Sequence, residues 1–243
     1  VTFTATVAFT PPAPGGPTGV VTFTDGVTFL GTEPVGAGGV AVYTTNSLAP
    51  GSHTVQATYG GDASFTGSVS NIVPHTVTQA STTTSVFSAP NPSFYGELAT
   101  FTALVTTASP FTPTGTVSLT IAGAPHAVAL INGVATYSQQ WLLPGAYSVT
   151  ATYGGETRFA PSASETITHF VAAAPTAMSL EAAPMTTYSG QLRVFTATVV
   201  PDLIGPVSAG IDALLQQGIV PSGIVTFTDG ATVIGVAALQ GQQ

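Results

Sequence analysis

The chain has 243 residues, of which 44% are hydrophobic and only 5% charged, with a formal net charge of −8. Its only basic residues besides histidine are Arg158 and Arg193, so nothing can neutralise a run of phosphates, and nucleic-acid binding is excluded. The absence of cysteine excludes disulfides and thiolate metal sites. Abundant Val, Phe and Thr argue against disorder, and no apolar run is long enough to predict a membrane-spanning helix.

The sequence repeats itself at the spacing of a domain. A motif like TFTATV occurs three times, and so does one like GVVTFTDG, whereas a motif like LAPGSHTVQATYGGD occurs twice. These phrases stand at 2–7, 100–105 and 194–199; at 19–26, 115–123 and 223–230; and at 48–62 and 142–156. A fourth phrase, STTTSVFSAPNPSFYGE, is found at 81–97 and, altered, at 175–191.

This order predicts three domains. The first repeat, 1–79, lacks the opening strand of the others; the second repeat, 80–173, is complete; and the third repeat, 174–243, holds the first half of the pattern. Only the third repeat carries a long insertion, at 201–223.

Within a repeat, apolar residues alternate with threonine. In TFTATV, Phe3, Ala5 and Val7 fall on one face of a strand and three threonines on the other. Short strands of this kind, separated by Asp-Gly, Pro-Gly and Gly-Gly, predict an all-β chain of antiparallel β-sandwiches. The pairs Asp25-Gly26 and Asp229-Gly230 are interpreted as turns, where glycine supplies a positive φ, rather than as metal ligands.

The pattern L-x-P-G-x-x-x-V-x-A-x-Y followed by GGD or GGE, together with G-x-V-x-F-x-D-G, resembles the group-3 bacterial Ig-like repeats. The resemblance implies seven-stranded Ig-like sandwiches strung head to tail in long extracellular proteins, as stalks, adhesin spacers or surface-layer components, without catalytic residues. The matching positions are structural: Leu48 and Leu142 in the core, Pro50-Gly51 and Pro144-Gly145 at a corner, and Tyr59 and Tyr153 at the end of the next strand.

Few residues are candidates for a site. No cofactor is expected; Asp62 and Glu156, after the Tyr-Gly-Gly corner, are weak candidates for calcium, which needs several converging carboxylates. The four histidines lie in different parts of the repeats and form no i, i+4 pair that could chelate a metal. Trp141, next to the inward Leu142, is expected to point away from the core, where it either covers a local patch or contacts a partner.

The insertion predicts a short helix near 208–217, with Ser208 as its N-cap and Gly218 as its stop. Its apolar stripe, formed by Ile211, Leu214 and Leu215, either covers its own domain or docks on a neighbouring subunit.

No catalytic motif is present, so the sequence predicts a non-catalytic structural protein outside the cell or on its surface, forming part of a filament, sheath or stalk. Neutral threonine faces can pack against copies of themselves, so the expected partner is the chain itself, head to tail. The missing strands of the third repeat come either from residues after Gln243 in a longer protein or from another copy by strand donation, with the first repeat as acceptor. The alternatives are an adhesin segment that binds a glycan or a surface protein, and a spacer beside an enzyme domain elsewhere.

Overall fold

The computed structural model describes every residue except 10–14, 203–219 and 241–243. By their contacts the residues form two units, Val1–Ser81 with Gly155–Ala160, and Thr82–Gly154 with Pro161–Gln243. Regular structure in the described residues is almost entirely strand, which confirms the all-β Ig-like prediction. The three-part division stays a prediction, and the expected helix near 208–217 lies outside the described residues.

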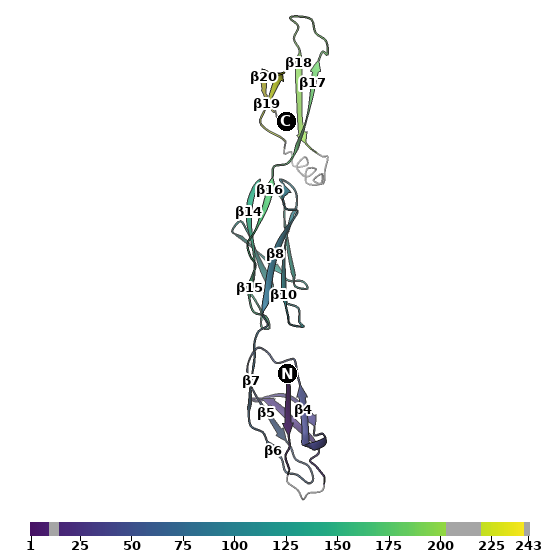
Figure 1. The fold of residues 1–243 in the computed structure, drawn as a ribbon, viewed down its shortest axis with the longest axis vertical. Coiled ribbons are helices and arrows are strands. Elements are labelled where there is room, and N and C mark those ends of the chain that lie inside the picture. Colours follow the sequence, from purple (N-terminus) through teal and green to yellow (C-terminus); the bar gives the residue numbers. More distant parts are fainter. Residues whose placement is uncertain (10–14, 203–219, 241–243) are drawn as a thin grey trace. The chain divides into compact units, whose positions relative to one another are not determined.

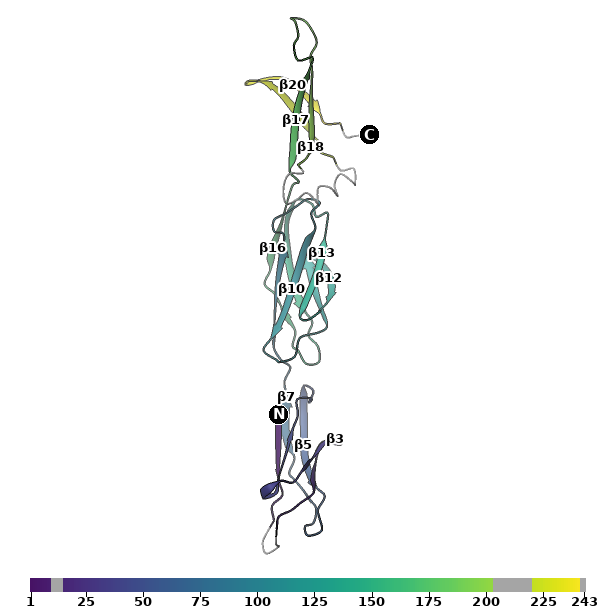
Figure 2. The same cartoon turned by 90° about the vertical axis from the view of Figure 1, so that its right-hand side faces the viewer.

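The first repeat folds into two sheets (Figures 1 and 2). In the smaller sheet, β1 (Thr2–Thr6) pairs antiparallel with β4 (Val40–Thr44). The larger sheet has the order β3-β2-β5-β6, with β7 also paired to β5; its strands are β2 (Val20–Asp25), β3 (Thr28–Pro34), β5 (Gly51–Tyr59), β6 (Ser68–Val69) and β7 (Val73–Val77). A 3-10 turn, Ala37–Gly39, precedes β4.

The second repeat has the same two layers with more strands. One sheet has the order β13-β10-β8, formed by β8 (Thr82–Ala89), β10 (Ala99–Thr107) and β13 (Val134–Gln139). The other has the order β12-β11-β14-β16-β9, with β15 (Ser162–Ala163) also on β14; its strands are β9 (Ser93–Phe94), β11 (Thr116–Ile121), β12 (Ala124–Ala129), β14 (Gly145–Tyr153) and β16 (Ile167–Ala172).

The described part of the third repeat consists of two hairpins. In one, β17 (Thr176–Ala183) pairs with β18 (Val194–Pro201), and in the other β19 (Ile224–Asp229) pairs with β20 (Thr232–Ala238). The rings of Phe195 on β18 and Phe227 on β19 lie 6.5 Å apart, so the two hairpins face each other through aromatic side chains.

The cores are built from the alternating apolar residues. In the first repeat the buried set is Phe3, Val21, Phe23, Ala41, Val55 and Tyr59. In the second repeat, Phe101, Leu119 and Tyr153 are fully buried, and the last two come from neighbouring strands of one sheet. Threonines occupy the opposite faces of these strands, as the period-two pattern predicts.

The same hydrogen bonds brace both repeats. The hydroxyl of Tyr59 donates to the Thr18 carbonyl at 2.7 Å, and that of Tyr153 donates to the Thr114 carbonyl at 2.8 Å. A serine hydroxyl accepts from the backbone of the facing strand in each, Ser70 from Ala57 N and Ser164 from Ala151 N, both at 2.9 Å.

Replacing Tyr153 with phenylalanine removes one of these braces without emptying the core. We expect the second repeat to lose about 1 kcal/mol of unfolding free energy, because the buried hydroxyl makes a hydrogen bond that phenylalanine cannot replace. Urea unfolding followed by the fluorescence of Trp141, the only tryptophan and a residue of this repeat, measures the loss. An unchanged midpoint would show that the brace contributes nothing to stability.

Candidate functional site

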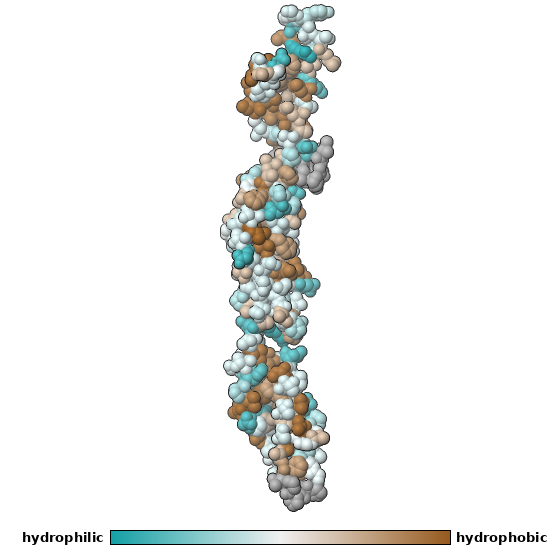
Figure 3. Space-filling model, viewed as in Figure 1, coloured by the Kyte–Doolittle hydropathy of each residue, from teal (hydrophilic) through white to brown (hydrophobic). Residues whose placement is uncertain are grey.

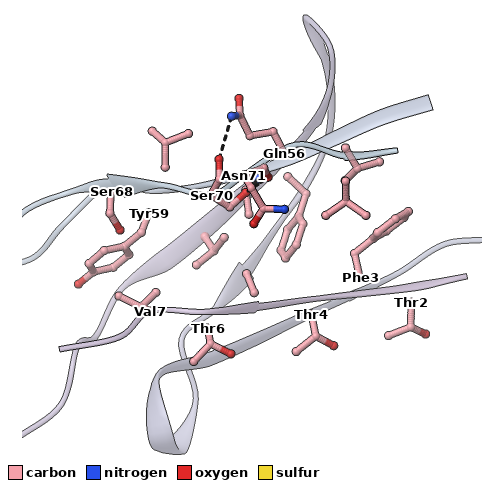
Figure 4. Close-up of a pocket in the computed structure, with 17 residues that line it drawn as sticks. Thr2, Phe3, Thr4, Thr6, Val7, Gln56, Tyr59, Ser68, Ser70 and Asn71 are labelled. Carbon is pink, nitrogen blue, oxygen red and sulfur yellow. Dashed lines mark hydrogen bonds between the residues drawn. The ribbon is translucent and has the colours of Figure 1, made fainter. Parts of the chain in front are cut away.

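An open groove of about 410 Å³ runs along β1 in the first repeat (Figure 4). Phe3 of β1 and Val7, just after this strand, line one side, and Val55 and Tyr59 of β5 line the other, with residues 68–71 and Val73 beyond them. The side chains of Thr2, Thr4 and Thr6 lie on the opposite side of β1 from Phe3 and Val7 in Figure 4. The groove therefore exposes apolar side chains of β1 and of the sheet opposite, together with polar groups of the three threonines, Gln56 and residues 68–71.

The second repeat has a strand at the corresponding place. Here β10, the counterpart of β1, pairs with β13 on one edge and with β8 on the other, in an antiparallel register from Thr100 opposite Ala89 to Thr107 opposite Thr82. Among the described residues β1 pairs only with β4. Its second edge therefore presents backbone groups without a strand partner among these residues.

Burial differs between the repeats at the same positions. Phe101, Ala103 and Val105 of β10 are 0%, 0% and 2% exposed, whereas of their counterparts only Phe3 is buried, at 9%, and Ala5 and Val7 are half-buried. The β8 residues Thr84 and Val86 are themselves buried in the second repeat, with 5% and 8% exposure. The groove lies beside β1 at the position that β8 occupies beside β10 in the second repeat.

In the second repeat a buried histidine lies next to β8 and β10. His169 of β16 is fully buried; hydrogen bonds join its Nε2 to Ser93 Oγ at 3.0 Å and its Nδ1 to Ser88 Oγ at 3.2 Å. Its ring meets that of Phe101 edge-on, with centroids 5.1 Å apart. Burial lowers the pKa of His169, so the neutral imidazole, which two hydroxyl groups can satisfy, is favoured.

The first repeat carries a histidine at the same position. His75 of β7 lies 94 residues before His169 and meets Phe3 edge-on at 5.6 Å, as His169 meets Phe101. The expectation that all four histidines occupy different parts of the repeats is therefore wrong for this pair. His75 is only half-buried, and its ring makes no hydrogen bond to a residue that the structure describes. Equal spacing of the two histidines was the signal in the sequence.

A second histidine braces the Asp25-Gly26 turn. Nδ1 of His53 lies 2.7 Å from Asp25 Oδ2, and Nε2 lies 2.7 Å from the Ala49 carbonyl oxygen. Both partners are acceptors, so only the protonated imidazole can donate to both. The hydrogen bond to Asp25 raises the pKa of His53 above its ordinary value, and the same bond lowers the pKa of Asp25.

The second repeat has a tyrosine and an isoleucine in place of this pair. Tyr147, 94 residues after His53, donates its hydroxyl to the Leu143 carbonyl at 2.8 Å, the counterpart of the Ala49 contact. Ile121 stands opposite Val149 where Asp25 stands opposite Val55. The loop is thus held in both repeats, but only in the first by a histidine that also contacts a carboxylate.

The weak calcium candidates lie in loops. Asp62 accepts four hydrogen bonds: the Thr18 amide and hydroxyl donate to Oδ2, both at 2.7 Å, and the Ser64 and Phe65 amides donate to Oδ1 at 2.8 and 2.9 Å. The Thr18 hydroxyl and then the backbone amides hold the pKa of Asp62 well below its ordinary range. The Glu156 carbonyl accepts from Gln79 Nε2 at 2.8 Å. Within the described residues no three His, Asp or Glu side chains converge as a metal site requires, and calcium binding stays a prediction.

Trp141 is half-buried at the start of the loop before β14. Its ring meets Tyr95 at 5.9 Å, in a cluster with Phe94 and Ala174. Its φ of 65° puts the backbone in the left-handed region, which is unusual for a residue with a side chain. These contacts fit local packing of Trp141, one of the two roles expected from the sequence.

The remaining motif residues lie in the cores or at the ends of strands. Leu48 packs against the first core and Leu142 is buried; Pro50-Gly51 and Pro144-Gly145 lead into β5 and β14, which end at Tyr59 and Tyr153. Asp25 and Asp229 end β2 and β19, and Gly26 and Gly230 follow with φ of 55° and 58°. The insertion residues Ile211, Leu214 and Leu215 lie outside the described residues.

The third repeat exposes much of its apolar surface. Brown, hydrophobic residues gather on the part of Figure 3 that carries β17 to β20. Met178 and Leu180 of β17 are 65% and 60% exposed, whereas their counterparts Thr84 and Val86 are buried.

Among solved structures, the fibronectin(III)-like modules of Clostridium thermocellum CbhA are similar, with 15% identity, a TM-score of 0.34, and 71% of this chain and 86% of that chain covered. A structure from a 1.5-MDa bacterial ice-binding adhesin has 17% identity and a TM-score of 0.34, with 77% of this chain and 62% of that chain covered. At these TM-scores neither likeness bears on function. No curated protein sequence matches. The family model of the bacterial Ig-like domain (group 3) matches residues 1–78 and 85–172, so the chain belongs to this family of Ig-like domains.

Proposed function

We propose that the chain is a non-catalytic structural segment of an extracellular or cell-surface stalk, sheath or filament. The observation that carries this proposal is what recurs between the first two repeats. Equivalent hydrogen bonds hold strands and loops in place in both repeats. They are made by Tyr59 and Tyr153, by Ser70 and Ser164, and by His53 and Tyr147. Repetition of stabilising contacts suits a protein whose role is reach and rigidity.

The neutral surface supports association with like surfaces. Outward threonines cover β1 and much of β10, and only 12 of the 243 residues are Asp, Glu, Lys or Arg. Neutral polar faces come into contact without the large desolvation cost of ions. Within the described residues no helix has the length and apolarity needed to cross a membrane.

The finer proposal concerns how copies join. Among the described residues, one edge of β1 in the first repeat has no strand partner and lies beside a groove of apolar and polar side chains, and strands of the third repeat carry exposed apolar side chains. Head-to-tail association by strand donation between these end repeats would cover both surfaces at once.

Electron microscopy of the native material tests this role. We expect ordered fibres or sheaths in which consecutive subunits meet through their end repeats. Separate beads on a string, with no subunit contacts, would contradict assembly and leave a plain stalk.

A further inference from the structure

We propose that the peptide bond between Arg158 and Phe159 is a latent cleavage site for endoproteases that cut after basic residues, and that the segment 79–81 keeps it closed. The chain contains no lysine and two arginines, Arg158 and Arg193. Arg158 is therefore the only position in residues 1–192 that such an enzyme recognises. The bond and the segment that covers it both lie among the described residues.

Arg158 itself is accessible. It lies in the loop between β14 and β15 and is exposed, whereas Phe159, the next residue, is 2% exposed. A protease of the trypsin class takes the basic side chain into a pocket and must also reach the carbonyl group after it, whose oxygen it holds by backbone N–H groups. Whether the bond is cut therefore depends on the backbone around it.

The backbone around this bond is hydrogen-bonded on both sides. The N–H of Ala80 donates to the Arg158 carbonyl oxygen at 2.9 Å, and the carbonyl oxygen of Ala80 accepts from Ala160 N at 2.9 Å. Ala80 and Phe159 thereby form a parallel bridge. Within the loop, Phe159 N donates to the Glu156 carbonyl oxygen at 3.2 Å. The carbonyl and the N–H of the scissile peptide unit therefore both have partners that a protease must displace.

Gln79 fastens the same segment through its side chain. Its Nε2 lies 2.8 Å from the Glu156 carbonyl oxygen and 3.4 Å from that of Thr157. An amide group carries two N–H donors, so it satisfies both oxygens at once. By their contacts, residues Gly155–Ala160 group with Val1–Ser81, which agrees with a loop that is held by the segment lying on it.

Release of the segment 79–81 would open the bond to hydrolysis. The protease breaks the C–N bond between Arg158 and Phe159 and adds one water molecule, which leaves a carboxylate on Arg158 and an ammonium group on Phe159. The cut falls between β14 and β16, which pair antiparallel. We expect this pairing to keep the two pieces together until the repeat unfolds.

The first repeat has the same loop without a cleavage residue. Residues 62–65 are the counterpart of residues 156–159, and each loop is closed by a hydrogen bond of 2.9 Å from its first amide to its last carbonyl. Ser64 stands 94 residues before Arg158, so the first repeat has no basic residue here. Cleavage is therefore confined to one point of the first two repeats.

Trypsin digestion of the full chain with Arg193→Gln tests the proposal, because Arg158 is then the only cleavage residue. We expect the folded chain to be cut at least about 30-fold more slowly than a synthetic peptide of residues 154–163, since cleavage has to wait for local opening. Mass spectrometry of the products identifies the cut.

Two substitutions in this background open the segment. Ala80→Pro removes the N–H that binds the Arg158 carbonyl, and Gln79→Glu replaces a donor with an acceptor beside two carbonyl oxygens. Each is expected to raise the cleavage rate about 5- to 10-fold, because the open form becomes more populated.

The matched control is Thr78→Ala, one residue before the segment. Thr78 is exposed, and its replacement is expected to change the cleavage rate less than about 2-fold. Urea unfolding followed by Trp141 fluorescence is measured for every variant, and we expect an unchanged midpoint for the second repeat where cleavage is faster.

Three results would overturn the proposal: a folded chain that is cut as fast as the peptide, a cleavage rate that neither Ala80→Pro nor Gln79→Glu raises, or a faster cleavage that only follows a loss of global stability. In the last case the bond would be reached by unfolding of the repeat and not by release of the segment. Digestion uses dilute chains, so its outcome is independent of the fibres that the proposed function predicts.

Discussion

Replacing Phe101 with alanine is expected to destabilise the second repeat by about 3–5 kcal/mol, because the ring is fully buried between two sheets and its removal leaves a cavity. The ring also supports His169, whose imidazole meets it edge-on at 5.1 Å. Urea unfolding followed by Trp141 fluorescence reports on this repeat alone, since the chain has no other tryptophan.

Phe3→Ala is the matched control in the first repeat. Phe3 stands at the same place, but it borders the open groove, and the strand that covers Phe101 has no counterpart among the described residues. We expect a smaller loss, about 2 kcal/mol, because much of the space left by the ring opens to water instead of forming a closed cavity. Far-UV circular dichroism reports the strands of every repeat, so the loss in the first repeat is read from the transition that circular dichroism shows and Trp141 fluorescence does not. Equal losses for the two variants would mean that the groove is closed in solution.

The strand faces could be predicted from the sequence because their cause is local. Phe3 lies inward and Thr2 and Thr4 outward because a strand turns successive side chains to opposite faces. The same rule places Val55 and Tyr59 in the core on β5. Repetition of the phrases then predicted the same architecture for the second repeat, and the family match supports it.

The polar contacts could not be predicted in the same way, because their partners are distant in sequence. Ser93 and His169 are 76 residues apart, and Asp25 and His53 are 28 apart on neighbouring strands. The Asp25-Gly26 pair predicts a turn, and nothing in the neighbouring sequence indicates that Asp25 also forms a hydrogen bond with a histidine. The groove depends on the comparison between the first two repeats, since its lining residues are ordinary core residues when a strand covers them.

The stabilities of the first two repeats are expected to change with pH in opposite directions. In the second repeat the change comes from His169. Burial lowers the pKa of His169 below its ordinary value of 6.5, and the groups that face it are Ser88, Ser93 and Phe101, none of them charged. The unfolded chain therefore takes up this proton before the folded one does. The contribution of His169 to the unfolding free energy of the second repeat is fully present above pH 6.5. It falls as the pH drops from 6.5 toward the pKa of His169 in the folded state, by about 1.4 kcal/mol for each pH unit between the unfolded and folded pKa values.

The first repeat has the reverse dependence through His53 and Asp25. The pKa of His53 is raised, so its contribution is complete below pH 6.5 and is lost as the pH rises through the folded pKa. The pKa of Asp25 is lowered, so its contribution is complete above pH 3.8 and is lost only as the pH falls through that lower value. The pair therefore stabilises the first repeat most fully between pH 3.8 and 6.5.

Urea unfolding at about pH 5 and about pH 8, on either side of the ordinary histidine pKa, separates the two effects. Trp141 fluorescence is expected to show a lower midpoint at the acidic pH for the second repeat. For the first repeat, the transition that circular dichroism shows and Trp141 fluorescence does not is expected to have a lower midpoint at the alkaline pH. His169→Gln should abolish the acidic loss and His53→Gln the alkaline loss, because glutamine keeps polar contacts without titrating. If both midpoints moved in the same direction, or if the two substitutions left the pH dependence unchanged, titration of these histidines would not govern the stability of the repeats. The replacement of His53 by Tyr147 at the equivalent hydrogen bond would then not change how stability depends on pH.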